Sequence, residues 1–376
     1  MKFSITREVF LKNLRHSQSV VEKRSSIAIL SNVRLEAREN KLITTATDND
    51  IAVQGVADAF VETADATTVN AHKLYDIVNK LPEGVMVNAE LTQAKDRLTV
   101  SAGKARFSLA CLDADGFPDF TSIDGQKSFT IKGSELKRLL TKAQFAASQE
   151  DTRQYLNGVY LHVAHNDSAE ATQGKTLRAV ATDGHRLAQV EQPLPEGAED
   201  MPGVIIPRKT VGELRKLGEE AKEINVSVTD KKIQFKTPEV TITSKVIDGT
   251  FPDYQRVIPL DNNFEMDVPR QTLMQAVDRV AILSHEKSRS IKFSLASNQL
   301  TISANNPDQE NASEEMRVEC DETDISLGFN AKYVAEIGGL FEGEDMQFFL
   351  KDGSSPVVLK DPKDGASLFV LMPMRI

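Results

Sequence analysis

Asp183 and His185 are the residues of this 376-residue sequence whose types and spacing come nearest to an acid–base centre. They are two positions apart in the segment VATDGHRLA, residues 180–188, and a carboxylate beside an imidazole is an arrangement used in general acid–base catalysis. No serine or cysteine nucleophile with a plausible oxyanion partner accompanies them. An Asp-Gly pair between two alternating segments also signals a tight β-hairpin. We favour the hairpin and keep catalysis as an alternative.

The other residues capable of metal binding or nucleophilic attack form no pattern typical of an enzyme. The six histidines include no HExxH motif, and Cys111 and Cys320 make neither a zinc motif nor a disulfide framework. The sequence also contains no GxxxxGK[ST] loop, no GxGxxG motif after a strand and no GxSxG elbow. We therefore predict a non-catalytic protein with no metal and no cofactor.

Length and composition limit the class of protein further. The chain is long enough for two or three domains, and its 40% of apolar residues can form a core in each. No run of 18 apolar residues is present, and the charged N-terminal segment lacks the features of a signal peptide, so we expect a cytoplasmic protein. Aromatic residues make up 6% and tryptophan is absent, which argues against a protein that stacks single-stranded bases.

The sequence repeats itself three times, with a period near 130 residues. An alternating segment runs into an amphipathic one at the start of the chain, again in KSFTIKGSELKRLLTKAQFA from 127, and again in FEMDVPRQTLMQAVDRVAIL from 264. A second set of similar segments follows in the same order: KLITTATDNDIAV (41–53), TLRAVATDGHRLA (176–188) and QLTISANNPDQEN (299–311).

Each copy reads as a strand, a helix of about four turns, several strands, a short helix and a closing meander of strands. This order predicts an α+β fold built from three tandem strand–helix–strand–meander units. DGFPDF (115–120) and DGTFPDY (248–254) close the first two copies. We place the domain boundaries so that the domains span 1–126, 127–258 and 259–376.

The charge of the chain is unevenly distributed between the predicted helices and the rest. The formal net charge is −10, yet the helices and their leading turns contain 18 basic and 7 acidic residues, a balance of +11. Such a partition allows one basic surface to attract phosphates while the remainder repels them. None of these segments has the Asn, Gln or Arg array of a major-groove reader, which favours contacts independent of DNA sequence. The segments counted are 6–24, 72–80, 132–148, 208–218, 269–283 and 331–340.

The triple repeat and the basic helices resemble the bacterial sliding clamps, the beta subunits of replicative DNA polymerases. The resemblance covers the whole chain and is carried by MKF at the start, YLNG, VATDGHRLA, FPDY, ANNP and the C-terminal VLMPMRI. It implies the DNA clamp fold and a head-to-tail homodimeric ring, with the helices lining the hole and duplex DNA encircled. The implied function is that of a processivity factor. Its partners would be the replicative polymerase alpha subunit, the clamp loader, and other polymerases and repair proteins.

The resemblance also implies a hydrophobic groove that takes short linear motifs of these partners. Methionine suits such a shared surface because its side chain adapts to varied apolar groups. Carried over by position, the groove residues are Leu156, Thr182, Gly184, His185, Arg186, Leu187, Pro252, Arg256, Val257, Asn330, Tyr333, Val370, Met372, Pro373 and Met374.

The resemblance also implies a dimer interface, and together with the charge pattern it indicates candidate DNA contacts. For the dimer interface, Arg106 and Phe107 of one chain would meet Ile282 and Leu283 of the other, although core packing is an alternative for these side chains. The candidate DNA contacts are Arg24, Lys73, Lys137, Arg138, Lys142, Gln149, Arg153, Tyr155, Lys209 and Arg215.

Three hypotheses therefore remain open on the sequence. The first is a processivity clamp that encircles DNA. The second is an enzyme that uses Asp183 and His185. The third is an adaptor whose repeats bind peptides and never DNA.

Overall fold

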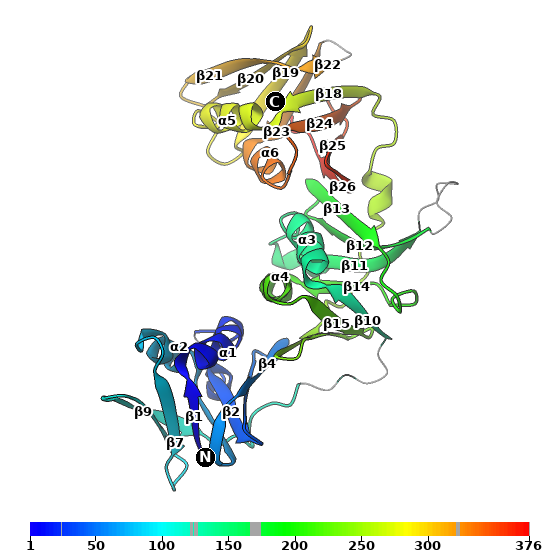
Figure 1. Cartoon of the computed structure of the whole chain (residues 1–376). Helices are drawn as coiled ribbons and strands as arrows, with labels where there is room; N and C mark the ends of the chain where they lie inside the picture. Colours follow the sequence, from blue (N-terminus) through cyan, green and yellow to red (C-terminus); the bar gives the residue numbers. More distant parts are fainter. Residues whose placement is uncertain (24, 121–122, 124–126, 166–173, 321–323, 376) are drawn as a thin grey trace. The chain divides into compact units, whose positions relative to one another are not determined.

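The computed structural model describes the chain except for residues 24, 121–122, 124–126, 166–173, 321–323 and 376 (Figure 1). The chain forms two compact units. The first comprises 1–137, 195–202 and 209–246, and the second comprises 138–194, 203–208 and 247–376. Each unit holds one whole predicted domain and part of the central one. The two domain boundaries proposed from the repeat therefore stay predictions, and residue 126 lies outside the described residues.

The elements recur in the order that the repeat predicts. We call residues 1–126, 127–258 and 259–376 the first, central and third copies. The first copy contains β1 (Lys2–Thr6), α1 (Arg7–Val20), η1 (Ala28–Ser31), β2 (Asn32–Arg38), β3 (Lys41–Thr47), β4 (Ile51–Asp58), β5 (Phe60–Thr63), β6 (Asp65–Asn70), α2 (Ala71–Lys80), β7 (Met86–Leu91), β8 (Arg97–Ala102) and β9 (Ala105–Leu112).

The other two copies follow the same order with small differences. The central copy contains β10 (Lys127–Lys132), α3 (Gly133–Gln144), η2 (Asp151–Leu156), β11 (Gly158–His165), β12 (Lys175–Thr182), β13 (Arg186–Pro193), β14 (Val204–Pro207), α4 (Arg208–Glu220), β15 (Glu223–Val228), β16 (Lys232–Lys236), β17 (Val240–Lys245) and η3 (Tyr254–Val257). The third contains β18 (Phe264–Pro269), α5 (Arg270–Ala281), β19 (Ser290–Ala296), β20 (Gln299–Asn305), β21 (Asn311–Arg317), β22 (Glu319–Cys320), β23 (Ile325–Asn330), α6 (Ala331–Gly338), β24 (Asp345–Leu350), β25 (Val357–Asp361) and β26 (Asp364–Leu371).

Each of the six predicted helices is present, and local chemistry explains where they begin and end. Asn70 and Asn330 cap α2 and α6, because their side-chain oxygens accept the backbone N–H groups of Lys73 and Lys332. The first helix is shorter than the predicted 6–24 and ends at Val20, since Val21 adopts extended backbone angles. In the described part of the chain, no helix combines the length and apolar character needed to cross a bilayer.

Two antiparallel four-stranded ladders support the helices of each copy. The ladder formed by the first strand and the closing meander is β1-β7-β8-β9 in the first copy, β10-β15-β16-β17 in the central copy and β18-β24-β25-β26 in the third. The other ladder is β6-β2-β3-β4, β14-β11-β12-β13 and β23-β19-β20-β21, respectively. The apolar face of each helix packs on these strands, as shown by the edge-to-face rings of Phe3 in β1 and Phe10 in α1, 6.0 Å apart.

The last strand of a copy pairs with the fourth strand-forming segment of the copy before it. β17 pairs with β4 from Val240↔Gly55 to Ser244↔Ile51, and β26 pairs with β13 from Arg186↔Leu371 to Val190↔Ser367. We call these pairings the first and second seams. The first seam lies within the first unit and the second seam within the second unit.

Ion pairs stabilise both seams. They lie at the hairpins β16–β17 and β25–β26, which contain the last strands of the central and third copies. In the first seam, Lys12 of α1 contacts Glu239 of the β16–β17 turn at 2.5 Å. In the second, Asp364 at the start of β26 contacts Lys142 of α3 at 2.6 Å and also pairs with Arg138. Asp364 and Lys142 are 12% and 7% exposed, so the second pair is much better shielded from water than the first.

Replacing Asp364 tests the contribution of the second seam to stability. Burial by itself raises the pKa of Asp364, but hydrogen bonds from Lys142, Ser367 and Arg138 outweigh it and lower the pKa from 3.8 to about 2. The stabilisation is therefore complete above pH 4 and disappears as the pH falls towards 2. We expect Asp364→Asn to lower the free energy of unfolding by about 3 kcal/mol at pH 7, because Lys142 is left buried without its main partner.

Urea denaturation measures the free energy of unfolding of the second unit at pH 7 and between pH 4 and 2. The matched control is Asp58→Asn, which removes an ion pair to Lys41 from a carboxylate that is 87% exposed and should cost less than about 0.5 kcal/mol. Equal costs for the two variants, or an effect of Asp364→Asn that persists at pH 2, would contradict the assignment.

Candidate functional site

The turn between β12 and β13 is the hairpin expected from its Asp-Gly pair. Gly184 has a φ of +88°, a conformation that favours glycine. Asp183 Oδ1 accepts the backbone N–H groups of His185 and Arg186 at 2.9 and 3.0 Å, and its Oδ2 accepts Arg186 Nε at 3.0 Å. The Asp183 carboxylate thus contacts the backbone N–H of His185, while its second oxygen accepts a hydrogen bond from the Arg186 guanidinium. This geometry supports the hairpin and gives no support to an Asp183–His185 acid–base pair.

Arg186 lies beneath the surface that it was expected to line. Its side chain is 7% exposed and its guanidinium stands between two aromatic rings, 4.9 Å from the centre of Phe145 and 4.2 Å from that of Tyr333. Besides Asp183, it donates to Phe145 O at 2.7 Å and to Glu336 of α6. The expectation that Arg186 lines an open groove is therefore corrected: it joins the β12–β13 hairpin, the end of α3 and α6 from below.

The most apolar of the predicted groove residues form a buried floor. Leu156, Leu187 and Val370 are 4%, 2% and 2% exposed and belong to one cluster with Phe251 and Tyr254. Leu187 and Val370 face each other across the second seam. These side chains support the surface above them and have little area of their own to offer a partner.

Exposed residues from three segments stand around this floor, and we call 182–187, 252–257 and 370–374 together the hairpin–tail surface. Val257 is 51% exposed and Met372 39%. Met372 N donates to His185 O at 2.9 Å and Met374 N donates to Gly328 O at 2.8 Å, which holds the C-terminal segment between the hairpin and the third copy. All fifteen predicted groove residues lie in the second unit, so the structure brings the three segments together.

A buried hydrogen-bond chain holds the 252–257 segment in place, and sequence reasoning missed most of it. Tyr254 Oη accepts from Arg178 Nη1 at 2.9 Å and lies 3.1 Å from His162 Nε2, while Arg178 also pairs with Glu191 at 2.7 Å. Burial lowers the pKa of His162, and the nearby Arg178 charge acts in the same direction. The neutral imidazole can therefore accept the Tyr254 hydroxyl. Only the repeated FPDF and FPDY motifs pointed to this tyrosine from the sequence.

Many of the candidate DNA-contacting cations already have acidic partners. Lys137 pairs with Glu219 at 2.9 Å, Arg153 with Glu150 at 3.0 Å and Lys209 with Asp48 at 2.5 Å. These three side chains are still 39–42% exposed, and such surface pairs exchange readily for other charges. Lys73 is exposed and Tyr155 is 37% exposed. Arg215 is half-buried on α4.

The prediction that Lys142 and Arg138 contact DNA is corrected, because both side chains are held in ion pairs with Asp364. Lys142 is 7% exposed and contacts Glu342 at 3.4 Å in addition to Asp364, so it cannot reach a phosphate without leaving a buried ion pair. Arg138, 29% exposed, is committed to the same carboxylate. Both act in the second seam. The Gln149 side chain lies against the Arg208 guanidinium, and Arg24 lies outside the described residues.

The predicted interface residues lie in different units, on β9 of the first copy and directly after α5 of the third. Arg106 is exposed and Phe107 half-buried on β9, which shows its last residue, Leu112, 43% exposed. Ile282, directly after α5, is 77% exposed, and Leu283 is half-buried. The core-packing alternative considered for Ile282 does not fit this exposure.

Comparison with known proteins identifies the family. Models of the DNA polymerase III beta subunit match in three parts: its N-terminal domain over 1–121, its central domain over 130–253 and its C-terminal domain over 255–375. The chain belongs to the DNA polymerase III beta subunit family. Membership confirms the predicted α+β clamp fold, and it makes the chain a non-catalytic subunit, which settles the choice between clamp and enzyme.

Relatives with this fold are similar over their full length. The beta sliding clamp of Caulobacter vibrioides is 43% identical over 377 residues, and that of Escherichia coli is 36% identical over 380, with 100% of both chains covered in each comparison. The crystal structure of a sliding clamp from Bartonella birtlesii bound to griselimycin superposes with a TM-score of 0.95 at 40% identity, again covering 100% of both chains.

Arg186→Lys tests whether the planar guanidinium is required beneath the hairpin–tail surface. One ammonium cannot stack between two rings and also reach Asp183, Glu336 and Phe145 O, so we expect the free energy of unfolding to fall by about 2 kcal/mol. Thermal or urea unfolding measures the change. Arg256→Lys is the control, because Arg256 is 84% exposed and its pair with Asp253 should contribute little. A tolerated lysine at 186 would show that charge alone suffices there.

Proposed function

We propose that this protein is a processivity clamp that assembles head-to-tail into a homodimeric ring around duplex DNA and tethers the replicative polymerase to it. The observation that carries the proposal is the repeated pairing between copies. β17 of the central copy pairs with β4, and β26 of the third copy pairs with β13. Among the described residues, the same rule leaves one donor strand, β9, and one acceptor strand, β21, without such a partner.

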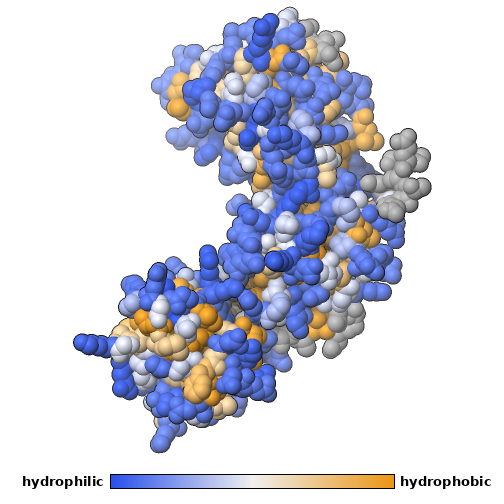
Figure 2. Space-filling model, in the orientation of Figure 1, coloured by the Kyte–Doolittle hydropathy of each residue, from blue (hydrophilic) through white to orange (hydrophobic). Residues whose placement is uncertain are grey.

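Both remaining strands have open edges that a second copy can satisfy. β9 pairs along its length with β8, but it meets β6 only at Thr68↔Leu112 and Val69↔Cys111, and β21 ends the sheet β21-β20-β19-β23. An unpaired edge with apolar side chains is a site where proteins associate. On the face shown in Figure 2, apolar side chains gather on the part of the chain formed by the first copy.

Pairing of β9 with β21 of a second chain makes the association head-to-tail, and in the proposed dimer two such pairings close the ring. Arg106 and Phe107 of β9 would then meet Ile282 and Leu283 after α5. This arrangement follows the second seam, where Phe145 after α3 packs on Phe369 of β26 with ring centres 5.8 Å apart. Six domains, with boundaries near 126 and 258, would form the ring.

The distribution of charge supports DNA in the hole of such a ring. The helices and their leading turns carry +11 in a chain of net charge −10, so phosphates are attracted to the helices and repelled elsewhere. A closed ring is retained on DNA by its topology and does not need tight or sequence-specific contacts. Lys73, Lys137, Arg153, Tyr155, Lys209 and Arg215, with Arg24 and Gln149, are the proposed contacts.

The hairpin–tail surface is the proposed docking site for linear motifs of the polymerase alpha subunit, the clamp loader and other polymerases and repair proteins. Its floor of Leu156, Leu187 and Val370 supports the exposed Val257 and Met372, which offer an adaptable apolar surface. A tethered polymerase gains a high effective concentration at its template, which is the physical basis of processivity. Replication places the protein in the cytoplasm.

Acidic substitutions on the hairpin–tail surface should weaken peptide binding. We expect Val257→Asp and Met372→Asp each to lower the affinity for a peptide bearing the polymerase's clamp-binding motif by at least about tenfold, because an apolar contact is replaced by a hydrated charge. Fluorescence anisotropy with the intact protein measures the affinity. Leu260→Asp is the matched control, since Leu260 is 96% exposed and lies three residues after Val257. An equal loss in all three variants would contradict the docking site.

Acidic substitutions at the proposed interface should open the ring. We expect wild-type protein at about twice the chain mass of 41.5 kDa, and we expect Phe107→Asp and Ile282→Asp to give species of one chain mass. Phe60→Asp, at an apolar residue that is 68% exposed on β5, should leave the dimer intact. Light scattering measures the masses.

The same variants decide between an encircling clamp and an adaptor. Loaded with its loader on nicked circular DNA, the wild-type dimer should remain bound in high salt until the DNA is linearised, and the Phe107→Asp protein should not be retained. Retention that survives linearisation would exclude encirclement, and a dimer that binds peptides but is never retained on DNA would favour the adaptor.

A further inference from the structure

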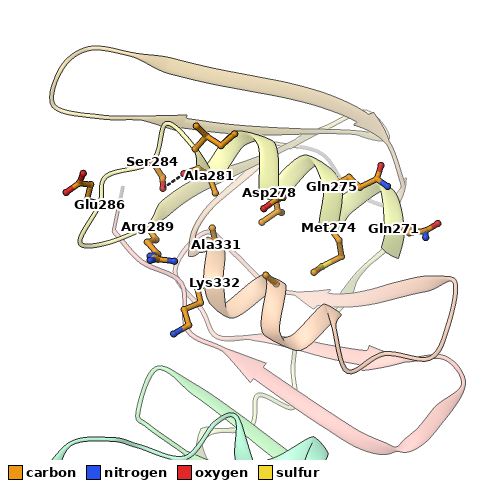
Figure 3. A pocket seen from close by; sticks show the side chains of 13 residues that line it. Gln271, Met274, Gln275, Asp278, Ala281, Ser284, Glu286, Arg289, Ala331 and Lys332 are labelled. Carbon is orange, nitrogen blue, oxygen red and sulfur yellow. Dashed lines mark hydrogen bonds between the residues drawn. The ribbon is translucent and has the colours of Figure 1, made fainter.

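A pocket in the third copy, with a volume of about 950 Å³, lies between α5, the loop 282–289 and the start of α6. Figure 3 shows that the side chains of Arg289, from the loop, and Lys332, from α6, occupy the same end of this pocket. Glu286, another lining residue, points away from them in this view, and Asp278 lies farther along α5. The two cations therefore share one end of the opening.

Lys332 occupies the same place in its copy as Lys209 does in the central copy. The strand before α6 and the strand before α4 pair in equivalent ways, Asn330 with Ser290 and Pro207 with Gly158. The next residues also correspond, since Ala331 N donates to Arg289 O at 2.9 Å and Arg208 N donates to Asn157 O at 3.1 Å.

Lys209 is used within the first seam. Its ammonium donates to Val20 O at the end of α1, at 2.8 Å, and to Asp48 of the β3–β4 turn at 2.5 Å. Both acceptors belong to the first copy. The lysine thus spans two copies and neutralises the aspartate of the TATD segment.

In the second seam a different cation has taken this role. Asp183 of the VATD segment corresponds to Asp48, and its carboxylate pairs with Arg186 of its own copy, which also donates to Phe145 O just after α3. Lys332 is consequently released from the seam. Its side chain is 53% exposed, and its nearest carboxylate, Glu336, is 3.8 Å away.

The loop that carries Arg289 is well ordered by its own backbone contacts. His285 Nδ1 accepts the N–H groups of Lys287 and Ser288 at 3.2 and 3.4 Å, and Arg289 N donates to His285 O at 2.7 Å. Arg289 and Lys287 are exposed, and among the described residues neither has a carboxylate at ion-pairing distance. Arg289 and Lys287, unlike the paired candidates on the central copy, need not leave an acidic partner to meet a phosphate.

We propose that Arg289 and Lys332 form a site for the phosphate backbone of duplex DNA on the third copy. This inference rests on the proposed clamp function and adds the third copy to contacts otherwise predicted only on the first and central copies. The loop after α5 corresponds to the loops after α1 and α3, which contain the candidates Arg24 and Arg153. Arg289 and Lys332 are exposed, and the ion pair of Lys332 with Glu336 is long at 3.8 Å. Both cations therefore suit sequence-independent contact, because release of counterions from the phosphates drives the association.

The test compares the intact dimer with the Arg289→Gln/Lys332→Gln dimer in binding a fluorescent duplex over a range of salt concentrations. Each lost phosphate contact should reduce the slope of log affinity against log salt by about 0.9, so the double variant should lose about 1.8. The control is Lys231→Gln/Lys236→Gln, which removes the same charge from exposed residues of the central copy and should leave the slope unchanged. Light scattering and peptide binding show that each variant remains a folded dimer.

The outcomes separate this inference from the proposed function. A smaller slope in the Arg289→Gln/Lys332→Gln protein alone supports the site. An unchanged slope in that variant, with clear salt dependence in wild-type protein, overturns the site and leaves the clamp intact. Equal losses in variant and control also overturn the site, because net charge then explains them. Absence of salt-dependent DNA binding in the wild-type dimer also overturns the site, whereas the clamp function is overturned only if retention on circular DNA survives linearisation.

Discussion

The constraint on which the structure depends is the hydrogen bonding of the strand that closes one copy to a strand of the neighbouring copy. A sheet edge exposes a row of unpaired N–H and C=O groups, and each copy of the repeat ends in such a strand. β17 and β26 satisfy theirs on β4 and β13, so three similar units become one chain with a defined order. The proposed pairing of β9 with β21 of a second chain would extend the same rule from folding to assembly.

The two seams share their backbone pairing but differ in the side chains that lock them. Lys209 of the central copy neutralises Asp48 in the first seam, whereas Arg186 neutralises Asp183 from within the central copy in the second. Arg186 can also stack between Phe145 and Tyr333 because its guanidinium is planar, which a lysine cannot do. The exchange places a rigid cation below the hairpin–tail surface and leaves Lys332 outside the seam, lining the pocket and 3.8 Å from Glu336. The change in the cation that pairs with the aspartate of the repeat thus affects both the hairpin–tail surface and the pocket beside Lys332.

Features with a local cause could be predicted from the sequence, and features created by distant residues could not. The period of the apolar residues predicted the helices, and the Asp-Gly pair predicted the hairpin at Asp183. The burial of Arg186 depends on Phe145 and Glu336, which are 41 and 150 positions away, and that of Lys142 depends on Asp364, 222 positions away. A basic residue at a hairpin, such as Arg186, or on an amphipathic helix, such as Lys142, gives no local sign of such a partner. Both were therefore predicted to be available to ligands.

Backbone hydrogen bonds alone do not determine which hairpin pairs with which strand edge, because any open edge offers the same N–H and C=O groups. Side-chain charge provides the distinction. Lys12 and Arg138 stand at the same position of α1 and α3, and both contact an acidic residue of the inner hairpin, Glu239 or Asp364. The free β8–β9 hairpin carries Lys104 and Arg106 instead, and α5 has the neutral Gln275 at the corresponding position, followed by Asp278. If this hairpin took the place of an inner one, its cations would oppose Lys12 or Arg138, and like charges at close range are unfavourable. The reversed charge therefore disfavours the β8–β9 hairpin in the inner seams and, in the proposed dimer, favours the α5 end of the second chain.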